Sequence, residues 1–175
     1  MLITKEEFDI KYKKYFDQIF KIAYGYTLNS NDAIDIVQES FIKFYKANKT
    51  FTDSEQEKYY LIRITINQSI DFIKKAKRIL LFDNGYVDNL PDVLDSDNNY
   101  EEINECVSLL KDSYKSVIIL YYYENYSIKE ISSILKISET AANSRLGRAR
   151  IKLKKIIEER RNNNGKRWIT KYCED

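Results

Sequence analysis

The residues best suited to chemistry lie on a basic segment near the C-terminus, residues 138–161, in which apolar residues recur at spacings of three and four. That spacing predicts one long amphipathic helix. Its buried face would consist of Ala142, Leu146, Ala149, Leu153 and Ile156. The opposite face carries donors suited to base edges, with basic residues beside them suited to phosphates. These are Thr140, Asn143, Ser144, Gly147, Arg148 and Lys155, flanked by Arg145, Arg150, Lys152 and Lys154. The pattern favours DNA binding over a merely solvated helix.

A short helix is expected immediately before this basic one, at residues 127–135. Ser127 is a natural N-cap and is followed three residues later by Glu130, which is the spacing of a capping box. Ser138 is a natural N-cap for the basic helix. Two helices joined by a turn of about three residues, the second much more basic, are typical of a helix-turn-helix.

Composition excludes most catalytic chemistry. The chain has 175 residues and no histidine, so Ser-His-Asp hydrolases and His-ligated zinc sites are excluded. Its two cysteines, Cys106 and Cys173, are far apart, which fits a reducing cytoplasm and offers no CxxC pair. No phosphate-binding glycine motif occurs, and the acidic residues are scattered. The sequence predicts a protein that is not an enzyme and needs no metal or cofactor.

The whole chain is expected to be all-α, with two small helical domains joined by an acidic linker. Helical periodicity predicts three N-terminal helices, at residues 5–26, 31–47 and 54–78, and a further helix at 103–124. Residues 79–105 hold eight acidic side chains, no basic one and the only proline. The expected units are therefore 1–78, a linker at 79–105 and a unit at 106–175. No signal peptide is recognised, and no apolar run approaches the roughly 20 residues that a bilayer requires.

Three segments resemble the extracytoplasmic-function sigma factors. Residues 114–153, YKSVIILYYYENYSIKEISSILKISETAANSRLGRARIKL, are similar to region 4 of that family. NDAIDIVQESFIKFY and YLIRITINQSIDFIKK resemble two helices of its region 2. The resemblance implies a subunit that directs core RNA polymerase to promoter DNA, with region 4 at the −35 element and region 2 at the −10 element. It also implies an anti-sigma partner.

The helix at 31–47 would carry the surface that binds core polymerase. Its core face would consist of Ala33, Val37, Phe41 and Phe44. Asp35, Gln38, Glu39 and Ile42 would then point outward, and an apolar side chain within an acidic patch suits protein docking. In the family, this helix contacts the clamp helices of the largest polymerase subunit. Without the resemblance, a solvated acidic face would be the simpler interpretation.

The helix at 54–78 would read the −10 element with a polar stripe opposite its buried face. The stripe consists of Tyr60, Arg63, Asn67, Asp71, Lys74 and Arg78. Asparagine can bond an adenine edge, and Arg or Lys can bind phosphates. Tyr59 and Tyr60 could stack on bases. The loop at 46–58 matches the family's site for a flipped base, where Phe51 is either an apolar wall or a residue tucked into the core.

Several residues depart from the family pattern. Lys136 stands where the family usually has a turn glycine, which would cost about 1 kcal/mol if this residue is left-handed. Ala142 and Asn143 replace the common Val-Lys pair, so the preferred −35 sequence cannot be transferred from relatives.

Two other functions remain open from the sequence. A helix-turn-helix regulator that binds an operator as a dimer explains the C-terminal half equally well, but it leaves the two N-terminal motifs unexplained. An antagonist of polymerase that binds protein alone is disfavoured by the basic helix.

The acidic linker would lie along the enzyme's nucleic-acid path and occupy basic surface there.

Overall fold

The computed structural model describes residues 4–82 and 98–172, and within these ranges the regular structure is entirely helical. This confirms the expected all-α class. Side chains are described for residues 4–79 and 102–162. Most of the expected acidic linker, residues 83–97, lies outside the described residues.

Three helices form the N-terminal half, namely α1 (Lys5–Thr27), α2 (Ser30–Lys46) and α3 (Ser54–Phe82). They pack against one another around a core of Tyr15, Ile19, Ile22, Ala33, Val37, Phe41, Phe44, Leu61 and Ile62. The tight joint between α1 and α2 depends on Leu28, which is left-handed at φ 52°. Asn29 then caps α2, its side-chain oxygen accepting the Asp32 N–H at 3.0 Å. The expected start at residue 31 was therefore slightly late, because Asn29 caps the helix.

The C-terminal half contains α4 (Asn98–Ser108), α5 (Asp112–Ile118), a π-helical turn η1 (Ile119–Tyr123), α6 (Ile128–Leu135) and α7 (Glu139–Tyr172). The expected single helix over 103–124 is wrong. The chain leaves the helix after Ser108, whose hydroxyl donates to the Glu105 carbonyl at 2.6 Å. Lys111 has extended backbone, and the next helix, α5, begins after it. α4 therefore ends at a serine that hydrogen-bonds the backbone of its own helix, although the apolar spacing of the sequence predicts that the helix continues.

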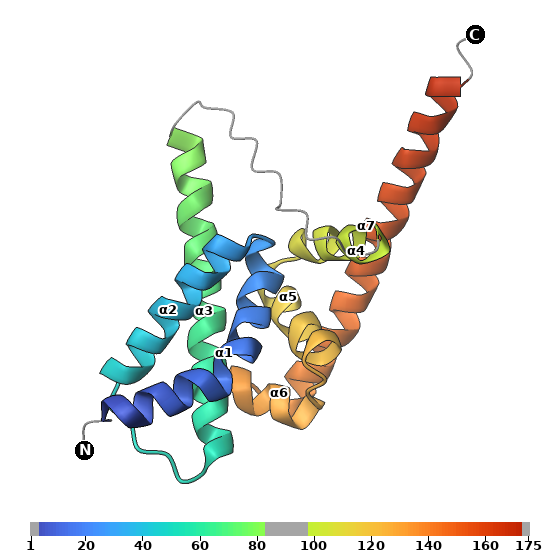
Figure 1. Cartoon of the computed structure of the whole chain (residues 1–175). Helices are drawn as coiled ribbons and strands as arrows, with labels where there is room; N and C mark the ends of the chain where they lie inside the picture. The colour runs from blue at the N-terminus through green and yellow to red at the C-terminus, as the bar shows by residue number, and fades with distance from the viewer. Residues whose placement is uncertain (1–3, 83–97, 173–175) are drawn as a thin grey trace.

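Three further helix boundaries differ from expectation. α3 continues to Phe82, beyond the expected end at residue 78, and α4 begins at Asn98, inside the segment expected to be linker. α7 runs to Tyr172, past the expected end at residue 161. Figure 1 shows the C-terminal part of α7 extending away from the other helices. The helix-turn-helix itself is as expected in order and position.

Local hydrogen bonds shape the α6–α7 unit. Ser127 and Glu130 form the predicted capping box, and the bonds that Glu130 receives from Ser127 lower the pKa of its carboxyl. Lys136 ends α6 in the left-handed region at φ 53°, so a lysine occupies a conformation that favours glycine. Ser138 accepts the Ala141 N–H at 3.1 Å and starts α7.

The two halves pack against each other (Figure 1). α1 packs against α2 and α3 of its own half and against α4 and η1 of the C-terminal half. The Tyr26 hydroxyl shares a buried 2.8 Å hydrogen bond with Ser116. Gln18 donates at 2.9 Å to both Glu124 and the Tyr126 hydroxyl. Apolar side chains from both halves belong to one continuous hydrophobic cluster. The described part of the chain is therefore arranged as one packed unit.

Glu124 is the residue of this contact whose hydrogen bonding is incomplete. Its Oε2 accepts from Gln18, but its Oε1 is buried and has no hydrogen-bond partner among the described residues. Burial raises the pKa of the Glu124 carboxyl, although Gln18 and Lys21 oppose the shift. Because the folded state holds the proton more tightly than the unfolded chain, the free energy of unfolding falls as the carboxyl ionises with rising pH.

A Glu124→Gln substitution should therefore stabilise the chain at pH 7, by roughly 1 kcal/mol, because it removes a partly buried charge but keeps an oxygen for Gln18. The gain should shrink on acidification, where Glu124 is itself neutral. Urea unfolding followed by circular dichroism between pH 4 and pH 8 measures both effects. Glu159→Gln, at an exposed carboxylate on α7, is the control. An equal gain at all pH values would contradict the burial argument.

Candidate nucleic-acid and protein-binding surfaces

The α7 helix presents its predicted polar face to solvent. Ala142, Leu146 and Ala149 are buried, and Leu153 and Ile156 pack against the core, which confirms the predicted inner face. The exposed residues of the predicted DNA-reading set are Thr140, Asn143, Ser144, Arg148, Lys152, Lys154 and Lys155. Arg145 is half-buried. A Cβ added at Gly147 would meet nothing within 4 Å, so the helix surface is open there.

The basic side chains of α7 differ in how firmly they are held. Arg150 donates from Nε to the Tyr122 hydroxyl at 2.8 Å, and its guanidinium lies 5.1 Å from the Tyr121 ring centroid. Lys154 and Lys155 make only exposed ion pairs with Glu158 and Glu159, at 3.8 and 3.7 Å. Such pairs contribute little, so both lysines are available to phosphates. The tyrosines that orient Arg150 were missed because η1 and α7 are far apart in the sequence.

The outward face of α2 is also where the sequence predicted it. Asp35, Gln38, Glu39 and Ile42 are exposed, and Ile42 shows 44% of its surface. Ile34 and Tyr45 are also exposed, at 38% and 39%. These two extend the apolar part of the surface at either end and were missed because each lies at the edge of the predicted outward face.

The polar stripe on α3 is only partly free. Asn67, Asp71, Lys74 and Arg78 are exposed. Lys74 lies 3.9 Å from the Asp112 carboxylate of the other half. Tyr60 is half-buried, and Arg63 sits over its ring at 5.4 Å. The distal members of the stripe thus face solvent, while Tyr60 also belongs to the packing of its own half.

Phe51 is half-buried and packs against the hydrophobic core in this arrangement. Its ring stacks on Phe44 with centroids 6.0 Å apart and planes at 6°, and it lies 5.4 Å from Tyr60. Lys49 holds its ammonium 4.6 Å from the Tyr60 centroid. Sequence reasoning missed Lys49 as a cation beside the loop.

Tyr59 is covered by the C-terminal half. Its hydroxyl donates to Glu130 at 3.2 Å, and its ring meets Tyr126 edge to face with centroids 6.0 Å apart. The first helix of the helix-turn-helix therefore sits against the start of α3. Tyr59 cannot stack on a base while the halves are arranged in this way.

Neither metal chemistry nor membrane insertion is indicated by the part of the chain that is described. Over residues 4–82 and 98–172, no cluster of three acidic, cysteine or histidine side chains could hold a metal ion. No helix in those ranges is sufficiently long and apolar to span a bilayer.

A helix-turn-helix whose second helix is basic and faces solvent defines a DNA-binding protein. Family models agree in detail: Sigma-70 region 2 matches residues 12–79, and Sigma-70, region 4 matches residues 100–153. The chain belongs to the sigma-70 family of RNA polymerase sigma factors, in its extracytoplasmic-function group.

Characterised relatives cover most of the chain. RNA polymerase sigma factor SigV of Bacillus subtilis is 31% identical over 78% of this chain and 82% of its own length. ECF RNA polymerase sigma factor SigM of the same organism is 29% identical over 83% of this chain and 91% of its own length. This chain is accordingly an alternative sigma factor, which directs RNA polymerase to specific promoters and starts transcription there.

Solved structures share the fold. The sigma factor RpoE of Bartonella quintana, in complex with the anti-sigma factor NepR, superposes with a TM-score of 0.66 at 17% identity, over 87% of this chain and 98% of that one. CnrH, in complex with the cytosolic domain of CnrY, gives a TM-score of 0.63 at 20% identity, over 89% and 90%.

Proposed function

We propose that this sigma factor reads a −35 element with the exposed face of α7 and a −10 element with α3 while α2 holds core polymerase. The observation that carries the proposal is the α7 face, where Asn143, Ser144 and Arg148 are exposed opposite a buried apolar seam. That geometry suits entry into a major groove. The −35 set is the one predicted, with Arg145, Arg150, Lys152 and Lys154 as the phosphate contacts beside it.

The −10 contacts would come from the exposed part of the α3 stripe, namely Asn67, Asp71, Lys74 and Arg78. Tyr60, Arg63 and Phe51 would take part only after local rearrangement, because they pack together with Phe44 or with one another. Region 2 would comprise residues 1–78 and region 4 residues 106–175, with 79–105 between them. α4 packs against α7 and would move with region 4.

Promoter reading would require the two halves to separate. In this arrangement α6 covers Tyr59, and Lys74 of the stripe lies against Asp112. The contact is rich in single polar bonds, each worth about 1 kcal/mol net, so binding to polymerase could replace it. An anti-sigma factor is the partner proposed to hold the inactive form, since both structural neighbours were solved as complexes with another protein.

The chain would perform no bond chemistry itself and would act in the cytoplasm, where polymerase and promoters are found. The exposed groups on α2, α3 and α7 are hydrogen-bond donors, cations and docking side chains, which suit binding.

The first prediction is that the purified chain binds promoter duplex weakly, whereas chain plus core polymerase initiates transcription from a matching promoter. Each half offers only a small DNA-reading surface, and linked modules gain effective concentration only when both can engage, by factors of about 100 or more. Run-off transcription and gel-shift titration measure this. Tight operator binding by a free dimer would instead identify a stand-alone regulator.

The second prediction concerns the α2 surface. An Asp35→Arg and Ile42→Glu double substitution should weaken core polymerase association by at least about tenfold, because it reverses a charge and removes an exposed apolar contact. A pull-down measures the loss, and circular dichroism checks folding. The matched control is Asp9→Arg with Ile10→Glu, which makes the same changes at adjacent exposed positions on α1. Equal losses in both variants would remove α2 from this role.

The third prediction separates base reading from phosphate contact on α7. Arg148→Ala should cost about 1–3 kcal/mol and relax preference at one −35 position. Lys154→Ala should weaken all promoters alike and lower the slope of log affinity against log salt by about one unit. Holoenzyme binding to a panel of −35 variants at several salt concentrations distinguishes the two. Uniform weakening by Arg148→Ala would contradict the proposed docking of α7.

A further inference from the structure

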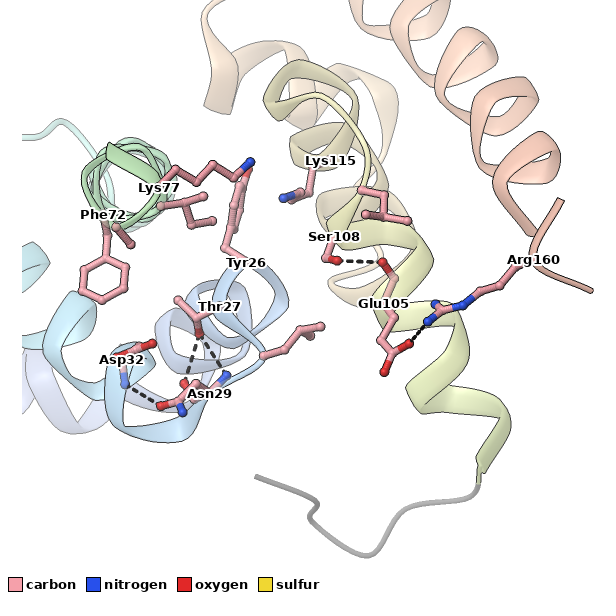
Figure 2. Close-up of a pocket in the computed structure, with 14 residues that line it drawn as sticks. Tyr26, Thr27, Asn29, Asp32, Phe72, Lys77, Glu105, Ser108, Lys115 and Arg160 are labelled. Atoms are coloured by element: carbon pink, nitrogen blue, oxygen red, sulfur yellow. Dashed lines mark hydrogen bonds and ion pairs between the residues drawn. The ribbon is translucent and has the colours of Figure 1, made fainter. Parts of the chain in front are cut away.

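A cavity of about 720 Å³ lies between the two halves of the protein. Its walls come from the α1–α2 joint and α3 on one side and from α4, α5 and α7 on the other (Figure 2). The volume is within the range of small-molecule sites. Since both halves supply walls, the cavity exists only while they are packed together.

Lys115 is the unusual residue of this cavity. The residue is only 3% exposed, and it is among those that line the space. None of the hydrogen bonds or ion pairs of the described residues involves its ammonium group, and the Asp112 carboxylate lies 3.9 Å from Lys74 instead. Its nearest compensation is the Tyr26 ring, with the centroid 5.5 Å away. Most of the side chain is buried while its ammonium faces the cavity, and this burial lowers the pKa of Lys115.

A second cation makes this environment still more positive. Lys77 of α3 also lines the cavity, and its charge further lowers the pKa of Lys115. In Figure 2 both ammonium groups lie near the Tyr26 side chain. Asp112 favours the charged form of Lys115, but its carboxylate is 3.9 Å from Lys74. The two lysines therefore converge without a carboxylate bonded to either among the described residues.

The remaining charges of the cavity lie elsewhere on its wall. Glu105 is bound to Arg160 as an ion pair, so neither carries an unbalanced charge. Asp32 is in the first turn of α2, near Asn29 and Thr27 and on the α2 side of the space in Figure 2. Between these groups the lining is apolar and includes Leu28, Ile73 and Leu109. The cavity thus has a cationic part at Lys77 and Lys115, an apolar part, and the Asp32 carboxylate on its α2 side.

We propose that this cavity binds a small phosphate monoester with an apolar body, its dianionic phosphate between Lys77 and Lys115 and its body against Leu28, Ile73 and Leu109. Two ammonium groups match the two negative charges of such a phosphate. The ligand supplies the anion that the buried Lys115 lacks. The pair of lysines beside apolar walls favours a phosphate monoester over a neutral ligand or a purely inorganic one.

Such a ligand would regulate the arrangement of the two halves. It contacts walls from both, so it binds the packed form and not a separated one. By linkage, the ligand multiplies the equilibrium ratio of packed to separated molecules. The factor is one plus the ratio of the free ligand concentration to its dissociation constant. A ligand at about 100 times that constant would favour the packed form about a hundredfold. The cavity would then couple a metabolite to the availability of the α3 and α6 surfaces.

Titration calorimetry of the full chain with phenyl phosphate tests the proposal. We expect saturable binding at one site, weakened at least about tenfold by Lys115→Met and by Lys77→Met. Methionine keeps an unbranched apolar stem as far as Cε and removes the charged Nζ, so Lys115→Met should remain folded. The matched control is Lys75→Met, which removes an exposed charge from the same helix outside the cavity and should bind as the original chain does.

Two further probes identify the chemistry recognised. Benzoate carries one charge on the same ring, and inorganic phosphate carries the anion without the ring; both should bind at least about tenfold more weakly than phenyl phosphate. No saturable binding of phenyl phosphate, undiminished affinity in Lys115→Met, or equal affinity for benzoate would overturn the proposal. The titration contains neither polymerase nor DNA, so its result does not depend on the promoter-reading assignments.

Discussion

The arrangement of this protein depends on the close contact that α1 makes with the C-terminal half. Gly25 permits it, since a Cβ at that position would come within 3.1 Å of the Ile119 side chain. One residue further on, the Tyr26 hydroxyl reaches Ser116 in a buried 2.8 Å hydrogen bond. α1 is thus a core helix of the N-terminal half and also the wall on which η1 and α5 rest. The cavity and the covered position of Tyr59 both require this contact.

The same contact includes polar groups as well as apolar ones. Its apolar centre is continuous with the cores of both halves, but its edge consists of polar bonds such as those of Gln18 with Glu124 and Tyr126. Glu124 leaves one buried oxygen unpaired, and the largely buried Lys115 side chain forms no ion pair among the described residues. Both features cost free energy in the packed form. They oppose the apolar contact, so a modest binding energy from a partner or ligand could shift the balance.

Much of the recognition surface was predictable because it depends on single helices. The inner face of α7 and the outward face of α2 follow from a spacing of three and four residues. The capping box of α6 needs only Ser127 and Glu130. The break after Ser108 was not predicted, since apolar residues continue through it and the hydroxyl that ends α4 bonds the backbone locally. The roles proposed for these surfaces rest on the family's motifs.

By itself, the sequence determined the helical class, the helix-turn-helix and which side chains share a face, because helical periodicity and capping act over a few residues. Only the tertiary structure decided which of those faces are free. Tyr59 and Tyr60 lie on the same helix, yet one is held by Glu130 and the other by Phe51 and Arg63. The partners of Lys115 and Arg150 likewise come from distant segments. Contacts between residues far apart in the chain depend on how the helices pack, and no local pattern encodes that.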